Sequence, residues 1–384
     1  MPTTDPGSDA SMMSVCYYGT YESQYPRNRV FIKGLKSQGI AVSECHVPLW
    51  ELEEHKGASF GFSISFLVRY LIAQLRLLWK FMTLPHADVI IIGYIGHLDV
   101  FSAWLLAKMF GAKLIFNPLV SLFDTVVSDR NFLSKTSLKG RLLLWLDQVA
   151  CKLSDIVILD TEEHIRFFKE ELKAKDTEFR RIWVGADDEV FKASGLNKRD
   201  DRFDILFIGK FIPLHGLSKV IEMASLLKSY PDIHFTVVGT GQLHAEIHAL
   251  AQSLQLTNTR FIEHVPYEEL GEAMETADLV LGIFGDSDKA RRVIPNKLYQ
   301  ALAMGRAVLT VDSPAARELL IDGETAFLCE ADPEIMAKRV LQIKADEKQR
   351  TTVAENGLAL FQNQLNIDEL GKLLITTLRL DLNE

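Results

Sequence analysis

Short, continuous runs of Ile, Val and Leu alternate with helix-like segments along almost the whole chain of 384 residues. Such runs occur at 88–94, 112–118 and 155–160, and the same alternation restarts after residue 203. Strands with this composition are buried on both faces, which is typical of a parallel sheet covered by helices on either side. The fold class is therefore predicted to be α/β, with two doubly wound parallel-sheet domains that face a cleft.

The polar stretch 192–203 interrupts this alternation and is predicted to link the two domains. We expect residues 1–13 to form a disordered tail, 14–195 the N-terminal domain and 203–365 the C-terminal domain. The last helix, 366–384, is expected to cross back onto the N-terminal domain.

The chain carries 42 Lys and Arg against 51 Asp and Glu, a net charge of −9, which argues against a nucleic-acid partner. None of the four cysteines forms a Cys-x-x-Cys pair, so the sequence offers no thiol-based zinc or redox motif. Scattered thiols fit a reducing compartment, and a cytoplasmic location is therefore expected.

Segment 58–82 is long and apolar, but Arg69, Gln74, Arg76 and Lys80 interrupt it, which argues against a membrane span. Two interpretations of this predicted helix stay open. Its aromatic residues and cations suit a helix lying on an anionic membrane surface, which would make the protein peripheral on the inner membrane face. Alternatively, the helix is partly buried and packs on the sheet.

Two turns in the second half of the chain carry cations beside backbone N–H groups. Lys210 and His215 flank one Pro-containing turn, and Lys297 follows the turn at Pro295. Such corners, where a loop leads into a helix, suit a phosphate-bearing ligand. Two of them in one half of a two-domain chain point towards an enzyme that uses a nucleotide sugar.

From about residue 14 onwards, the chain resembles the retaining glycosyltransferases of family 4, which have the GT-B architecture of two Rossmann-like domains. The similarity is strongest in 203–328, and 180–191 resembles the end of the family's first domain. This resemblance implies a UDP- or GDP-linked sugar donor bound mainly by the C-terminal domain and an acceptor held by the N-terminal domain. It also implies no metal and no other cofactor.

Four positions depart from the family pattern. Lys210 stands where the family has an arginine, so the charge is kept but the planar guanidinium is lost. His215 stands where the family has a lysine, and a neutral imidazole donates one hydrogen bond. Arg292 and Gln300 stand where the family has two glutamates, and the Gln300 amide can still bind ribose hydroxyl groups.

The resemblance implies most donor contacts at the ends of C-terminal-domain strands. Alternatives stay open: His215 as a solvent-facing turn residue, Lys297 as an exposed lysine at a helix start, and Gly239 and Gly241 as an ordinary turn. The implied donor-binding residues are Gly209, Gly239, Gly241, Gly285, Asp286, Pro295, Asn296, Lys297, Leu298 and Gln300.

The acceptor side is implied to lie in two loops of the N-terminal domain. The first loop follows the first strand and contains Gly19 and Arg27, although Arg27 could equally be the ordinary polar start of a helix. The second is a polar lip that contains Asp124 and Arg130.

His97 follows a buried strand, where ligands bind in parallel sheets, and it is a candidate for orienting the acceptor or touching the donor sugar. Together with Lys210 and His215 it completes the predicted catalytic set. Asp99 is expected to cap the following helix instead of contacting a ligand.

We therefore predict a retaining glycosyltransferase that moves a hexose from a nucleotide-diphosphate sugar to a glycan, lipid-linked or small-molecule acceptor. The leaving phosphate oxygen is implied to act as the base, so no carboxylate nucleophile is required. Two alternatives remain: a nucleotide-sugar epimerase or hydrolase on the same fold, and a non-catalytic protein that kept the GT-B scaffold.

Overall fold

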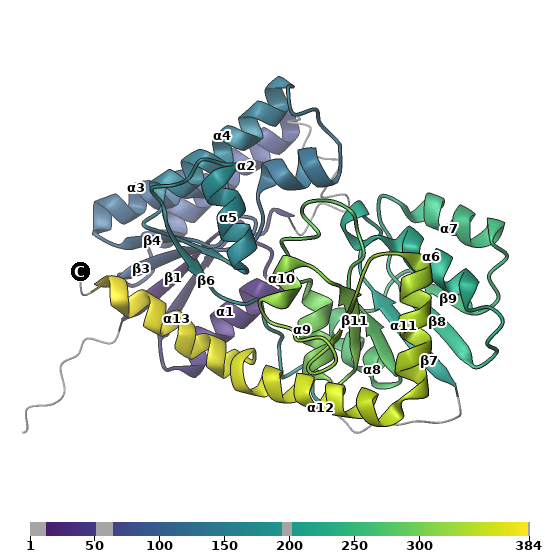
Figure 1. The fold of residues 1–384 in the computed structure, drawn as a ribbon. Coiled ribbons are helices and arrows are strands. Elements are labelled where there is room, and N and C mark those ends of the chain that lie inside the picture. The colour runs from purple at the N-terminus through teal and green to yellow at the C-terminus, as the bar shows by residue number, and fades with distance from the viewer. Residues whose placement is uncertain (1–12, 51–63, 194–201, 383–384) are drawn as a thin grey trace, which may run out of the picture.

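The computed structural model describes residues 13–50, 64–193 and 202–382, which form two domains that are each built on one parallel sheet (Figure 1). The N-terminal sheet has six strands in the order β2-β1-β3-β4-β5-β6. They are β1 (Ser14–Gly19), β2 (Ala41–His46), β3 (Val89–Ile92), β4 (Lys113–Phe116), β5 (Ile156–Leu159) and β6 (Glu178–Arg181).

The C-terminal sheet has six strands in the order β12-β11-β10-β7-β8-β9. Its first strand, like that of the other sheet, lies in the interior, so the strand order reverses beside it, where open parallel sheets bind ligands. The predicted α/β class with two doubly wound parallel sheets is confirmed. The strands are β7 (Phe203–Ile208), β8 (Ile233–Val238), β9 (Thr259–Ile262), β10 (Leu279–Leu281), β11 (Val308–Val311) and β12 (Phe327–Cys329).

The helices of the N-terminal domain flank its sheet (Figure 1). A π-helical turn, Asp124–Asp129, follows β4. The predicted helix 58–82 corresponds to α2, while 58–63, the tail 1–12 and the linker 194–201 lie outside the described residues. The helices are α1 (Pro26–Ser37), α2 (Ile64–Phe81), α3 (Val100–Phe110), α4 (Leu138–Leu153) and α5 (Glu162–Glu170).

The helices of the C-terminal domain alternate with its strands, and two long helices then lead back to the N-terminal domain (Figure 1). The helix that begins at Pro314 is only one turn long. The helices are α6 (Leu217–Leu226), α7 (His244–Ser253), α8 (Leu270–Glu275), α9 (Asn296–Ala303), α10 (Pro314–Arg317), α11 (Pro333–Ala345), α12 (Glu347–Gln364) and α13 (Ile367–Leu382).

One buried apolar cluster runs through both domains. Phe31 and Ile182 of the N-terminal domain belong to the same cluster as Tyr299 and Leu302 on α9. Because close-packed apolar side chains tolerate few gaps, this shared core holds the two domains against each other.

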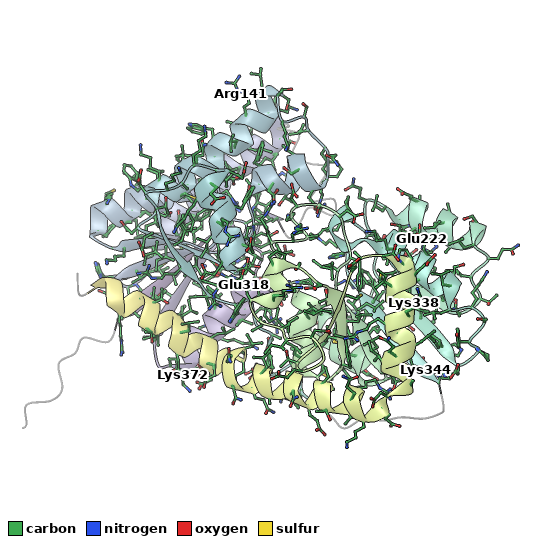
Figure 2. The ribbon with its side chains drawn as sticks, in the orientation of Figure 1. Arg141, Glu222, Glu318, Lys338, Lys344 and Lys372 are labelled. Carbon is green, nitrogen blue, oxygen red and sulfur yellow. The ribbon has the colours of Figure 1, made fainter. Side chains whose placement is uncertain are left out.

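The C-terminal helix α13 lies along α1 of the N-terminal domain (Figure 1). The two backbones meet at Gly34 and Gly371, where a Cβ atom on Gly371 would lie 2.2 Å from the carbonyl oxygen of Gly34. Lys372, the next residue, is half-exposed on the outer side of the helix (Figure 2).

Among the described residues, no helix has the length and apolar content that a membrane span requires.

Candidate functional site

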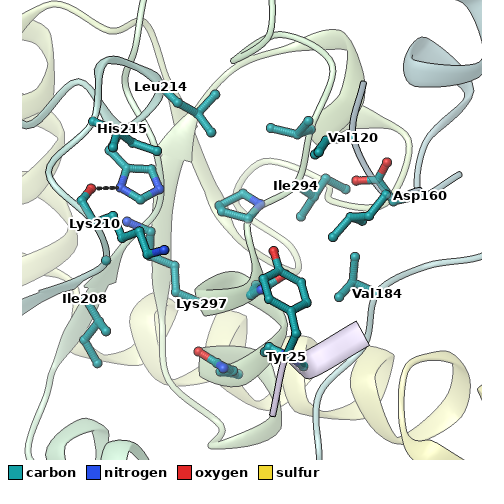
Figure 3. A pocket seen from close by; sticks show the side chains of 18 of the residues that line it. Tyr25, Val120, Asp160, Val184, Ile208, Lys210, Leu214, His215, Ile294 and Lys297 are labelled. Carbon is teal, nitrogen blue, oxygen red and sulfur yellow. Dashed lines mark hydrogen bonds between the residues drawn. The ribbon is translucent and has the colours of Figure 1, made fainter. Parts of the chain in front are cut away.

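A cavity of about 350 Å³ lies between the two domains (Figure 3). Tyr94 follows β3, Asp160 follows β5 and Gly209 follows β7, so the cavity lies at the carboxyl ends of strands from both sheets. Its volume is within the range of small-molecule sites. The polar residues that line it are Tyr25, Tyr94, Thr125, Arg130, Asp160, Lys210, His215, Tyr267, Lys289, Asn296, Lys297 and Gln300.

Cations outnumber carboxylates in this lining. Asp160 is the one carboxylate among the described lining residues, and its Oδ1 atom lies 2.8 Å from Nδ1 of the buried His164. The opposing cations are Arg130, Lys210, Lys289 and Lys297. A cavity with this excess of positive charge suits an anionic ligand.

Lys297 is the most informative side chain of the cavity. It lies in the first turn of α9 after the turn at Pro295 and is only 5% exposed. Its Nζ atom lies 3.5 Å from the centroid of the Phe207 ring and has no hydrogen-bond partner among the described residues. Burial lowers the pKa of Lys297 well below its usual value. An unpaired buried ammonium group is costly, and a phosphate ligand would compensate it.

His215 lies beside Lys297 at the turn after β7 (Figure 3). Its Nδ1 atom donates to the carbonyl oxygen of Lys210 at 2.5 Å, because a carbonyl can only accept. Burial, and then the charge of Lys297, lower the pKa of His215 well below its usual value. The neutral ring thus has its single N–H in use, and Nε2 presents a lone pair. A neutral His215 does donate one hydrogen bond, but within the protein, and its contact with a ligand stays a prediction.

The glycines of the predicted donor site build the corner around His215. A Cβ atom on Gly209 would lie 2.8 Å from the His215 ring and 3.3 Å from Nζ of Lys297. A Cβ atom on Gly239 would lie 2.0 Å from the carbonyl oxygen of Gly209, and one on Gly241 would lie 2.8 Å from the backbone nitrogen of Phe211.

The remaining predicted donor contacts divide into two groups. Pro295, Asn296 and Gln300 line the cavity, and Gln300 is only 4% exposed. The others lie outside the cavity lining, and their contact with a donor stays a prediction. These are Gly239, Gly241, Gly285 (packed on the Leu214 carbonyl), Asp286 (paired with Lys219) and Leu298 (in the shared core).

Of the predicted acceptor residues, Arg130 lines the cavity, whereas Gly19, Arg27 and Asp124 lie outside its lining. Arg27 is fully buried, and its guanidinium donates to Oδ1 of Asn117 at 2.8 Å and to the carbonyl oxygen of Ile182 at 2.7 Å. Gly19 is buried at the end of β1, where a Cβ atom would lie 2.6 Å from Oδ2 of Asp99. The Asp99 carboxylate accepts from the Thr20 backbone at 2.7 Å and makes no cap bond to α3, so its predicted capping role is wrong.

His97 is buried behind the cavity wall. Its Nε2 atom lies 3.1 Å from the carbonyl oxygen of Val120 and 3.3 Å from a carboxylate oxygen of Asp147. Val120 lines the cavity, whereas His97 does not. The described position therefore suits a residue that positions the loop 117–123, and direct contact with a sugar stays a prediction.

Asp124 and Arg292 join the two domains. The Arg292 guanidinium donates to Oδ1 of Asp124 at 2.8 Å and stacks on Phe167, with its Cζ atom 4.1 Å from the ring centroid. The Arg292 carbonyl accepts from the Thr161 hydroxyl at 2.5 Å. Arg292, which stands where the resemblance implies a glutamate, therefore contacts the other domain and does not line the cavity.

Sequence reasoning missed several lining residues as site residues, chiefly Asp160 and Tyr267. The sequence signal that could have found such residues is their position in the segment after a strand. Asp160, for example, directly follows β5. Burial raises the pKa of Tyr25 to about 12, and a hydrogen bond with Asn296 partly offsets this effect.

Among the described residues, no group of three or more His, Cys, Asp or Glu is arranged to hold a metal ion.

Comparison with known proteins relates this geometry to glycosyl transfer. Residues 188–359 match the family described as Glycosyl transferases group 1. A phosphatidyl-myo-inositol mannosyltransferase of Mycobacterium tuberculosis is 29% identical over 134 residues, or 34% of this chain and 33% of that protein. The match therefore spans about a third of the curated relative's length.

Solved structures resemble the whole chain. The sucrose-phosphate synthase of Thermosynechococcus elongatus has a TM-score of 0.74 at 15% identity, covering 97% of this chain and 99% of that one. The Anabaena protein HepE, solved with UDP and glucose, has a TM-score of 0.65 at 16% identity, covering 96% and 99%. At these identities the likeness concerns the fold. The protein therefore has the GT-B fold, and its second half is similar to the glycosyl transferases of group 1.

Proposed function

We propose that the protein is a retaining hexosyltransferase that uses a UDP- or GDP-linked sugar without a metal at the diphosphate. The observation that carries this proposal is the unpaired, buried ammonium group of Lys297 in a cavity between two GT-B domains. The HepE structures with UDP and with UDP-glucose support a nucleotide-sugar ligand in such a fold.

The chemistry is loss of a nucleoside diphosphate from the anomeric carbon of the sugar. Negative charge grows on the leaving phosphate, and Lys210 and Lys297 stabilise it electrostatically. Gln300 offers an amide to the ribose hydroxyl groups. The two domains exclude water and align the acceptor, so the leaving phosphate oxygen takes the acceptor proton and no protein carboxylate is needed as a base.

We further propose that the acceptor is lipid-linked and that the protein docks on an anionic membrane surface at the inner membrane face. The helices α2 and α3 contain no acidic residue and carry Arg69, Arg76, Lys80 and Lys108. The mannosyltransferase relative is named for a lipid acceptor. Most large apolar side chains exposed among the described residues lie on or next to α2, α3 and α4, including Ile64, Leu71, Leu75, Trp79, Leu105, Met109, Leu138 and Trp145.

The transferase proposal is tested by incubating the protein with UDP- and GDP-linked hexoses, with and without polyprenyl-phosphate or phosphatidylinositol acceptors. We expect nucleoside diphosphate release that requires an acceptor, and a product whose anomeric configuration matches the donor by NMR. Lys210→Ala should lose most of this activity at an unchanged melting temperature. Acceptor-independent release would indicate a hydrolase, altered donor sugar an epimerase, and binding without product a scaffold.

Replacing Lys297 with Met keeps the length of the side chain and removes its buried charge. The ligand-free variant should melt at the wild-type temperature or on the order of 2–4 °C higher, while stabilisation by UDP or GDP is lost. Thermal unfolding with and without nucleotide measures both effects, and Lys338→Met, on exposed α11, is the control (Figure 2). A variant that melts several degrees lower and still responds to nucleotide would contradict the assignment.

Binding of a nucleoside diphosphate should add a proton to His215. The free ring has a lowered pKa and is neutral at pH 7; a phosphate beside it favours the charged form and raises this pKa, so affinity increases as pH falls from 8 towards 6. Calorimetry at pH 8, in two buffers of different ionisation enthalpy, measures the uptake with the nucleotide phosphate fully ionised. The uptake should disappear in His215→Gln, and a buffer-independent wild-type enthalpy would exclude it.

The membrane proposal predicts that the double variant Leu71→Ser/Trp79→Ser co-sediments at least about tenfold more weakly with vesicles of phosphatidylglycerol and phosphatidylcholine, because both side chains lose apolar burial in the lipid. High salt should weaken binding of the wild-type protein. The matched control is Leu226→Ser/Ile321→Ser, which alters exposed apolar residues of the C-terminal domain. Equal sedimentation of both double variants would overturn membrane docking through α2.

A further inference from the structure

A second group of charges lies where the domains meet beside the cavity. The N-terminal domain contributes the π-helical turn 124–129 and the residue after it, Arg130. The C-terminal domain contributes Lys289 and Arg292 from the loop after β10. With Asp124 and Asp129, the group contains two carboxylates and three cations.

The carboxylates of this group already have partners. Asp124 accepts from Arg292 at 2.8 Å. Asp129 accepts a hydrogen bond from the Ser287 hydroxyl at 3.3 Å. Burial raises the pKa of Asp129, and the charge of Lys289 partly offsets this effect. Lys289 also donates to the Thr125 hydroxyl at 2.7 Å. The three cations exceed the two carboxylates by one charge, and the charge of Arg130 also acts on Asp129 and lowers its pKa.

Arg130 lies between this group and the cavity. It is a lining residue of the cavity, and its Nε atom is buried without a hydrogen-bond partner among the described residues. Its charge lowers the pKa of His215, after the larger effects of burial and of Lys297 and against the raising effect of the hydrogen bond with the Lys210 carbonyl, which places the guanidinium near the corner after β7. An Nε–H group without a partner in the described part of the chain, on a guanidinium near Lys297 and His215, points to the same anion.

The backbone of Arg130 is tied to the opposite domain. Its carbonyl oxygen accepts from Nε2 of Gln242 at 3.3 Å, and the turn before it carries the contacts to Ser287, Lys289 and Arg292. These contacts exist only while the domains are together. Arg130 consequently reaches the cavity as part of the closed arrangement.

We propose that Arg130 is a diphosphate-binding residue that supplies, from the N-terminal domain, the guanidinium that the corner at Lys210 lacks. The inference rests on the proposed function. A guanidinium presents a planar fork that matches two phosphate oxygens, whereas Lys210 and Lys297 act as point charges. The β-phosphate is the group that carries the growing negative charge as the bond to the sugar breaks, and Arg130 neutralises it across the domain interface.

Calorimetry with UDP, GDP and the corresponding monophosphates tests this role, because only the diphosphates carry a β-phosphate. Arg130→Ala should weaken diphosphate binding about tenfold to a hundredfold and monophosphate binding by much less. Arg130→Lys should lie in between, because the charge is kept and the fork is lost. Arg141→Ala, at the outer end of α4, is the control and should bind like the wild type (Figure 2).

A rescue experiment separates phosphate binding from a structural role. Lys210→Arg restores a guanidinium at the corner after β7, so it should recover much of the diphosphate affinity in the Arg130→Ala background and add little to the wild type. Failure of this rescue, or equal losses for mono- and diphosphates, would mean that Arg130 acts through the fold.

The other outcomes are equally informative. Unchanged diphosphate binding by Arg130→Ala, together with a raised KM for a phosphate-bearing acceptor, would assign Arg130 to the acceptor phosphate and overturn the donor assignment. Unchanged binding and unchanged kinetics would overturn both. A wild-type protein that binds no nucleotide would instead overturn the proposed function, so the two failures are distinguishable.

Discussion

The ammonium group of Lys297 is held almost entirely out of water, against the face of Phe207 and without a hydrogen-bond partner among the described residues. The ring offsets part of the cost, since cation–π contacts are worth roughly 0.5–2 kcal/mol, but it does not replace an anion. A side chain at the neighbouring Gly209 would crowd the ammonium group, because its Cβ atom would lie 3.3 Å from Nζ. The shared core that packs α9 between the domains therefore maintains a charge whose natural complement is a bound phosphate.

Residues that follow a strand directly were predictable from the sequence. Lys210 and Lys297 belong to short motifs at the ends of buried strands or the start of the next helix, and a parallel sheet brings such positions to one edge. The strands themselves were evident because burial on both faces leaves continuous apolar runs. Motif and sheet geometry together thus located the cavity and several of its cations.

Contacts between distant segments were not predictable in the same way. Asp124 lies 168 residues from Arg292 in the sequence, and no local sequence pattern predicts that the two side chains pair across the domain interface. The role of Gly239 and Gly241 was not predictable from the sequence, because a Gly-x-Gly turn has the same sequence whether its glycines meet a ligand or the neighbouring backbone. The hydrogen-bond state of His215 depended on the Lys210 carbonyl, which only the folded turn brings within 2.5 Å.

The departures from the family pattern form one connected change in this chain. An arginine at 292 in place of an acid would leave a buried cation unpaired, and Asp124 of the other domain balances it; removing one partner of such a pair is costly. That pairing ties the turn 124–129 to the C-terminal domain and brings the next residue, Arg130, to the cavity. If Arg130 binds the diphosphate as proposed, a guanidinium reaches the phosphate from the opposite domain in place of the one absent at Lys210. Neither domain alone would then hold the complete phosphate site, and donor binding would be coupled to domain closure.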